Sequence, residues 1–171
     1  VSLLTAQNAA RHEVPCWTLR NDTSPARPGK QYSPANTNLN GLQPAGDKTQ
    51  RSVAEVSLPE LLRAGGYRTI HAGKGHFGAQ GTPGANPLNL GFDVNIAGSY
   101  MGGTGSYHGD HNFSAAWRGG GTIWDVPGLD KYHGQTIDLT EAITREAIRA
   151  VEKSVADKAP FYLYMSHYAV H

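Results

Sequence analysis

The sequence predicts an α/β fold in which a mostly parallel sheet is flanked by helices and joined by long Gly/Pro-rich loops. Two segments with helix signals are each followed by a short run that reads as a strand, within residues 57–72 and 138–165. Helices that alternate with buried strands are typical of parallel sheets. The 21 Gly and 10 Pro residues among 171 indicate that long loops connect these elements.

The first helix–strand pair begins at a capping box. Ser57 and Glu60 stand three positions apart, as that motif requires. The glycines at 65–66 give the signal that often ends a helix, and the segment YRTIHA at 67–72 is the strand expected to follow. The helix is expected to bury three leucines, Leu58, Leu61 and Leu62.

The second pair is the clearest periodic segment of the chain. Asp138 and Glu141 open a helix whose apolar residues recur every fourth position and form one stripe. The stripe consists of Leu139, Ile143, Ala147, Val151 and Val155. The aromatic-rich apolar run at 161–165 then predicts a buried strand.

The rest of the chain is dominated by loop signals. Residues 2–11 lack Gly and Pro and predict a short helix, whereas 13–52 are rich in Pro and Asn and predict a long loop. Residues 78–135 are rich in Gly, Asn and Pro, with a short strand expected around 92–96. Loops of this length are uncommon in compact domains unless they are functional or disordered.

Composition excludes several classes of protein. The 15 basic and 14 acidic residues are spread along the chain, which argues against the clustered cations of a nucleic-acid-binding surface. There is no apolar run long enough to span a membrane. The single cysteine, Cys16, excludes an intrachain disulfide and a zinc site built from several cysteines.

Polar residues follow both predicted strands. Lys74 and His76 come after the first strand, and His167 and His171 come after the second. In parallel sheets ligands bind beyond the carboxyl ends of the strands, so these side chains are expected to meet at one edge. Lysine suits sulfate or phosphate oxygens, and histidine can donate to an oxyanion or protonate a leaving group. The alternative is that they are ordinary surface loop residues.

Other short motifs do not support a site. Lys74 is not part of a phosphate-binding P-loop, because Gly75 stands where that motif has Ser or Thr. The glycines at 103–105 lack the third glycine of a dinucleotide-binding turn. His108 and His111 have a spacing that suits a metal, but without a cysteine partner the pattern favours a solvated loop.

Four segments resemble the type I, formylglycine-dependent sulfatases of the alkaline-phosphatase-like superfamily. The segment LLRAGGYRTIHAGKGHFG, at 61–78, is similar to the family's helix ending in "GY.T", its strand and its motif "GKWH.G". Residues 2–14, 87–93 and 160–171 resemble further family segments, in the same order and at similar spacing. The linking segments are most similar to bacterial sulfatases that act on polysaccharides and aryl sulfates.

The resemblance implies an activity and a set of roles. Family members hydrolyse sulfate esters by attack of a formylglycine hydrate, with a bound Ca²⁺ that orients the sulfate. Lys74 resembles the lysine that bridges sulfate and nucleophile, and His76 the histidine that orients the formylglycine and assists sulfate release. His171 resembles the histidine that contacts the ester oxygen and protonates the leaving alcohol, and His167 is expected in the pocket wall.

The resemblance also implies that parts of the site lie outside the chain. Residues 1–171 correspond to a partial catalytic domain, truncated at both ends, with the formylglycine precursor before Val1 and the calcium ligands elsewhere. Cys16 is not expected to be the precursor, because Thr18 stands where the modification motif needs Pro or Ala. The isolated chain is therefore expected to be inactive. Gly75 departs from the family, whose motif has Trp there.

Alternatives stay open at this point. A phosphomonoester or phosphonate hydrolase of the same superfamily would share the sheet and differ in its nucleophile and metal ligands. A catalytically inactive, sulfatase-like binding protein would lack Cys or Ser at the modification site. The expected partner is a sulfated small molecule or glycan, and family resemblance suggests a periplasmic or extracellular location. Residues 97–135, rich in Gly, Tyr and His, are candidates for the substrate pocket, but no residue points to a given sugar.

Overall fold

The computed structural model of the chain describes residues 1–14, 18–22 and 37–170. Its helices are α1 (Ser2–Thr5), α2 (Ala9–His12), α3 (Leu58–Ala64) and α4 (Leu139–Ala156). Its strands are β1 (Leu42–Gln43), β2 (Val53–Ala54), β3 (Arg68–Gly73), β4 (Val94–Ile96) and β5 (Phe161–Ser166). Short 3-10 helices include η4 (Ala116–Arg118), η5 (Thr122–Trp124) and η6 (Asp130–Tyr132). Three more are η1 (Pro83–Ala85), η2 (Pro87–Leu90) and η3 (Gly109–His111).

The main sheet confirms the predicted parallel topology. Its strand order is β4-β3-β5, and β3 pairs in parallel with both neighbours. Gly73 at the end of β3 lies opposite Ser166 at the end of β5. The carboxyl ends of these two strands therefore lie at the same edge, which is the edge where the sequence predicts a site.

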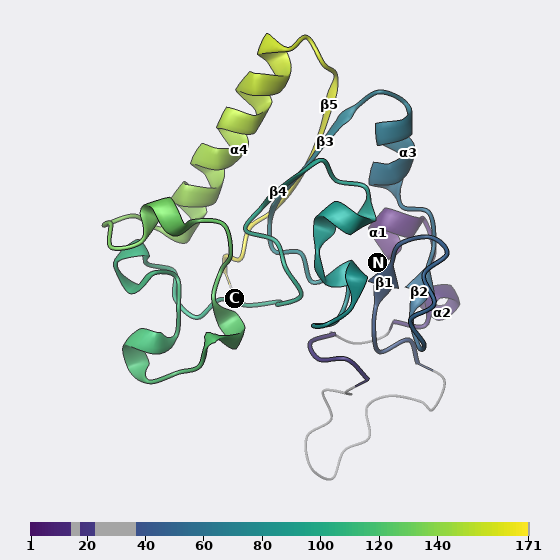
Figure 1. Cartoon of the computed structure of the whole chain (residues 1–171), viewed down its shortest axis with the longest axis horizontal. Coiled ribbons are helices and arrows are strands. Elements are labelled where there is room, and N and C mark those ends of the chain that lie inside the picture. Colours follow the sequence, from purple (N-terminus) through teal and green to yellow (C-terminus); the bar gives the residue numbers. More distant parts are fainter. Residues whose placement is uncertain (15–17, 23–36, 171) are drawn as a thin grey trace.

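Helices cover both faces of this sheet, as Figure 1 shows, with α4 on one side and α1 and α3 on the other. Each face has its own hydrophobic core. Under α4 the buried residues include Ala72, Phe113, Leu129, Leu139 and Ile143. On the opposite face they include Leu4, Leu42, Phe77, Leu90 and Phe92.

Helix α3 begins as predicted but packs differently. The Ser57 Oγ accepts a hydrogen bond from Glu60 N, and Glu60 Oε2 accepts one from Ser57 N at 2.8 Å, so the capping box is formed. The expected burial of the three leucines is wrong: Leu61 is 61% exposed and Leu58 and Leu62 are only half-buried, while Pro59 is buried. The reason is that the first turn of α3 packs against the backbone at 90–91, which leaves Leu61 on the outer side.

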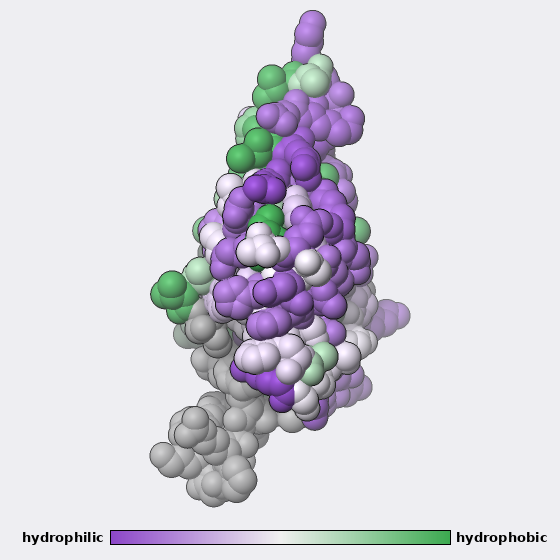
Figure 2. Space-filling view, turned by 90° about the vertical axis from the view of Figure 1, so that its left-hand side faces the viewer, coloured by the Kyte–Doolittle hydropathy of each residue, from purple (hydrophilic) through white to green (hydrophobic). Residues whose placement is uncertain are grey.

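Helix α4 confirms the apolar stripe over its first half. Asp138 caps it by accepting a hydrogen bond from Thr140 N, and Leu139, Ile143 and Ala147 are buried. Val155, at the far end of the stripe, is 64% exposed. The face that carries α4 is mainly hydrophilic, and its hydrophobic residues gather toward one edge (Figure 2).

The chain start departs from the single predicted helix over 2–11. Ala6 adopts a left-handed conformation that ends α1, and the Asn8 side chain accepts a hydrogen bond from Arg11 N and starts α2. The break follows because an Asn side chain competes well as a helix N-cap. Among the helices of the described residues, none combines the length and apolar character that crossing a bilayer requires.

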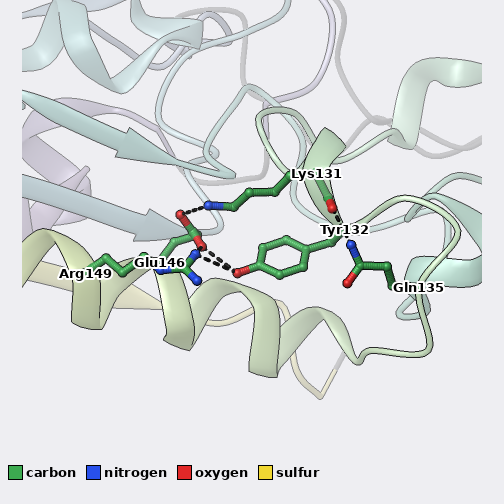
Figure 3. Close-up of polar contacts among 5 residues, drawn as sticks. All are labelled: Lys131, Tyr132, Gln135, Glu146 and Arg149. Carbon is green, nitrogen blue, oxygen red and sulfur yellow. Dashed lines mark hydrogen bonds and ion pairs between the residues drawn. The ribbon is translucent and has the colours of Figure 1, made fainter.

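A polar cluster fixes the long 97–137 segment to α4 (Figure 3). Glu146 accepts hydrogen bonds from Lys131 Nζ and Tyr132 Oη, both at 2.5 Å, and pairs with Arg149. Burial raises the pKa of Glu146, but these bonds and charges outweigh burial and hold the pKa below its ordinary value. The irregular segment is therefore attached to a regular helix, and it forms the walls of the cavity described next.

Candidate active site

A cavity of about 650 Å³ opens where β3 ends. Two parts of the chain line it: the turn directly after β3, and the segment that carries η4 and η5. The lining residues are Lys74, His76, Gly102, Gly103, Thr104, Tyr107, Arg118 and Trp124. Its volume lies in the range of small-molecule sites, and we call it the cationic cavity. Lys74 and His76 therefore line the same cavity, and the roles expected for them stay predictions.

The backbone of Lys74 is held by the end of β5. Lys74 N donates to Ser166 O, and Ser166 Oγ donates to Lys74 O, both at 2.6 Å. Gly73, at φ +105°, permits this approach, because an added Cβ would lie 1.9 Å from Ser166 O. Sequence reasoning missed Ser166. Its position directly after the predicted strand 161–165 and before His167 could have marked it as a residue of the sheet edge.

Gly75 is buried against the backbone of Ser99. A Cβ added to Gly75 would lie 2.7 Å from Ser99 O, and the neighbouring His76 N donates to that same oxygen at 2.8 Å. A side chain at position 75 would therefore collide with the backbone that follows β4.

His76 lies between two cavities. It lines the cationic cavity and a second one of about 250 Å³, which is also lined by Val1, Ser2 and Thr18. Its Nε2 donates to Thr18 O at 2.5 Å, and its backbone has a left-handed φ of 57°. A left-handed non-glycine residue is uncommon and persists where its surroundings fix it.

His71 lies beneath the turn and was not predicted from the sequence. It is fully buried on β3, and its ring packs against Phe77 and Tyr164. Asn95 Oδ1 accepts from Gly98 N, so His71 Nδ1 donates to that oxygen at 3.0 Å, while Nε2 lies 3.3 Å from Lys74 O. Burial lowers the pKa of His71 to about 4, so the imidazole is neutral near pH 7.

The outer wall of the cavity is formed by Tyr107 and Trp124. Tyr107 is fixed at two points, because its hydroxyl donates to Tyr168 O and its carbonyl accepts from Leu139 N, both at 2.7 Å. Trp124 O accepts from Gly105 N at 2.9 Å. Arg118 ends η4, is exposed, and has its guanidinium carbon 5.9 Å from the centre of the Trp117 ring.

The charge of this cavity is one-sided. No Asp or Glu is among its described lining residues. Lys74 and Arg118 also have no salt bridge to a carboxylate in the part of the chain that the structure describes. Two cations without acidic partners in one cavity favour an anionic ligand.

A neighbouring cavity of about 560 Å³ has the opposite character, and we call it the acidic cavity. It is lined by Asp110, Asp125 and Asp130, with no Lys or Arg among its described lining residues. His111 stacks on the exposed Trp117 at 4.4 Å. Across residues 1–14, 18–22 and 37–170, no three His, Cys, Asp or Glu side chains gather in a way that suits a metal ion.

The remaining predicted site residues stay predictions. His167 follows β5 at the same sheet edge, is half-buried, and its buried Nδ1 has no hydrogen-bond partner within the described structure. It is not among the described residues that line the cationic cavity. His171 and Cys16 lie outside the described residues.

Comparison with known proteins supports the fold. No family model matches the sequence, and no curated protein matches it. The solved structure of Ps i-CgsB in complex with k-i-k-neocarrahexaose matches at 24% identity and a TM-score of 0.62. Ps i-CgsB alone matches at 24% identity and a TM-score of 0.59. Ps i-CgsB is a carrageenan sulfatase, and these matches support a sulfatase-like fold for this chain.

The matched structures are much longer than this chain. Each match covers 99% of this chain and 33% of the other, so the chain spans a third of the length of the solved structures it matches. At this identity the likeness concerns the fold. It confirms a mixed α/β architecture with parallel sheets flanked by helices.

Proposed function

We propose that this chain is part of a sulfatase that hydrolyses sulfate esters of sulfated glycans. The observation that carries the proposal is the cationic cavity at the carboxyl end of β3, where Lys74 has no acidic partner within the described structure. Such a cavity at this edge of a sulfatase-like fold suits a ligand that carries a sulfate group.

The proposed chemistry assigns one task to each residue. Lys74 binds the sulfate oxygens, whose negative charge it balances in the ester and in the transition state. The bond between sulfur and the sugar oxygen breaks, and that oxygen takes a proton, for which His171 is the proposed donor. The formylglycine hydrate supplies the attacking oxygen in the family that the sequence resembles.

The described residues do not form a calcium site, because no suitable cluster of side chains is present among them. No step of the proposal therefore runs through a metal. His76 indicates where the nucleophile is proposed to lie, because this residue lines both the cationic cavity and the small cavity beside Val1. A modified residue directly before Val1 would adjoin the small cavity that Val1 and His76 both line.

A glycan is the proposed substrate class for two reasons. The cavity is far larger than one sulfate and has Tyr107 and Trp124 in its wall, and aromatic side chains pack well against sugar rings. One structural neighbour was also solved with the oligosaccharide k-i-k-neocarrahexaose. Both features support a sugar, rather than a small aryl group, as the part that carries the sulfate.

The test uses the full-length protein that contains this chain. Inorganic sulfate and phosphate release are measured from sulfated oligosaccharides, an aryl sulfate and the matching phosphate esters. We expect sulfate release that Lys74→Ala slows by about a hundredfold or more and that the exposed control Lys48→Ala leaves unchanged. Faster phosphate release would favour a phosphoesterase. Binding of the sulfated oligosaccharides without release of either anion would favour an inactive binding protein.

His171 provides a second arm of that experiment. A general acid matters most where the departing oxygen needs a proton. His171→Ala is therefore expected to slow hydrolysis of sugar sulfates far more than hydrolysis of nitrophenyl sulfate, whose leaving group departs without help. Equal losses with both substrates would contradict the proposed role.

A further inference from the structure

We propose that Arg118 binds a second anionic group of the glycan, a sulfate or a carboxylate, while Lys74 binds the sulfate that is removed. The inference rests on the proposed function and names the substrate class more narrowly. It makes the chain selective for glycans that carry two negative charges near one another.

The first support is the position of Arg118. It lines the same cavity as Lys74 but comes from η4, in the segment after β4, whereas Lys74 follows β3. The two cations therefore reach one space from separate parts of the chain. A single sulfate cannot fill a cavity of about 650 Å³, so one ligand with two anionic groups can use both cations.

The second support is the electrostatic state of Arg118. Its side chain has no salt bridge within the described structure, and no carboxylate is among the described residues lining the cavity. An arginine that stabilises the fold usually has such a partner, as Arg68 does with Asp157 at 2.7 Å. The guanidinium fork matches the paired oxygens of a sulfate or carboxylate better than an ammonium does.

The third support is the wall that the sugar would contact. Trp124 and Tyr107 line the same cavity as both cations. Their positions are set by the hydrogen bonds of Gly105 N to Trp124 O and of Tyr107 Oη to Tyr168 O. The Tyr107 side chain and the Trp124 backbone are thus held before a sugar binds, so less conformational entropy is lost on binding.

The acidic cavity explains why the second anion is assigned to Arg118. Trp117 lines the acidic cavity and the next residue, Arg118, lines the cationic one. On the far side of that segment, Asp110, Asp125 and Asp130 would repel an anion. A doubly charged glycan therefore gains from Arg118 only if both of its anionic groups stay in the cationic cavity.

The test compares three disaccharides in the full-length protein: one with a single sulfate, one with a second sulfate, and one with a single sulfate and a uronate carboxylate. Both kcat/KM and calorimetric binding are measured for wild type and for Arg118→Gln. The variant is expected to lose about tenfold to a hundredfold on the doubly charged ligands. It should lose less than about threefold on the monosulfate. Which doubly charged ligand loses more identifies the second group.

Two further variants keep the result interpretable. Arg118→Lys retains the charge and is expected to recover part of the loss. Arg145→Gln removes another exposed arginine, on α4, and should change neither kcat/KM nor binding for any of the three ligands. Unfolding midpoints equal to wild type would show that Arg118→Gln remains folded.

Each other outcome has a clear reading. Equal loss on all three ligands, or no loss on any, overturns the inference about Arg118. If wild type binds the doubly charged disaccharides without hydrolysing them and Arg118→Gln loses that binding, the inference stands and the proposed activity fails. If wild type neither binds nor hydrolyses them, both fail.

Discussion

Two neighbouring cavities of this molecule share one segment and differ in charge. Around 116–126 the chain contributes Arg118 and Trp124 to the cationic cavity, and Trp117 and Asp125 to the acidic cavity. Consecutive residues therefore face different ligand environments. This segment has no α-helix or strand, yet it places opposite charges in separate cavities. Its short 3-10 helices, η4 and η5, direct neighbouring side chains to different sides.

The difference extends to how the cavities are supported. The cationic cavity begins at the end of a central strand, where β5 holds the Lys74 backbone through Ser166 on both its N–H and its carbonyl. The described residues of the acidic cavity come only from the irregular 110–133 region. Binding sites placed on regular elements are held more rigidly than sites on loops. We therefore expect the functional effects of mutation to concentrate in the cationic cavity.

The largest expected effect is at Lys74. In the full-length protein, Lys74→Ala should lower kcat/KM for a sulfate ester by about a hundredfold to a thousandfold, because it removes a cation aimed at developing charge. Steady-state kinetics measure this loss. A loss of less than about threefold would show that the cationic cavity is not the reacting site.

The second prediction concerns His71, the neutral group beneath the cationic cavity. Its pKa is lowered to about 4 in the folded chain from 6.5, so the unfolded chain binds more protons between these values. The free energy of unfolding should therefore decrease as pH falls below 6.5, by about 2 kcal/mol between pH 7 and pH 5.

Urea unfolding of the wild type and of His71→Phe at both pH values isolates this contribution. The pKa of His12 is also lowered, first by burial, and contributes in the same direction in both proteins. The variant should be less stable at pH 7 and should lack the His71 part of the pH slope. An identical slope in both proteins would contradict a neutral, buried His71.

The third prediction concerns the tight contact at Gly75. Gly75→Ala should lower the free energy of unfolding by about 1–3 kcal/mol, because its Cβ would meet the Ser99 backbone. Gly121→Ala is the matched control, since a Cβ there meets nothing within 4 Å. Denaturant midpoints of the two variants compare them directly, and equal midpoints would show that the 97–101 backbone yields easily.

The smallest effect is expected in the acidic cavity. Asp110 is exposed and lines the acidic cavity but not the cationic cavity. Asp110→Asn should change turnover of a monosulfated sugar by less than about twofold, because exposed charges are screened over about 10 Å in salt. A tenfold change in the same kinetic assay would mean that substrate also occupies the acidic cavity.

Local signals predicted the regular part of the fold. The capping box at Ser57, the cap at Asp138 and the apolar stripe of α4 act over a few residues, so the sequence alone revealed α3, α4 and the strands after them. The burial of Leu61 was misjudged because its apolar character does not show which side of α3 packs against the rest of the chain. Val155 belongs to the predicted stripe but is exposed, because periodicity does not show how much of an apolar stripe is covered.

The site was predicted only in part, for a related reason. Lys74 and His76 follow a strand, and parallel topology places strand ends together. Tyr107, Arg118 and Trp124 lie in a segment without periodicity, whose path is set by distant contacts such as that of Leu139 N with Tyr107 O. A sequence pattern over a few residues cannot predict a contact between residues so far apart in the chain. His71 was missed because its environment depends on Phe77, Phe92 and Tyr164, which three different parts of the chain supply.

The most direct measurement is a crystal structure of the full-length protein with a sulfated oligosaccharide that is not turned over. We expect an oxygen of the ester sulfate within about 3 Å of Lys74 Nζ, with the sugar beside Trp124 in the cationic cavity. A sulfate bound in the acidic cavity, or one bound elsewhere with Lys74 turned away from it, would contradict the account.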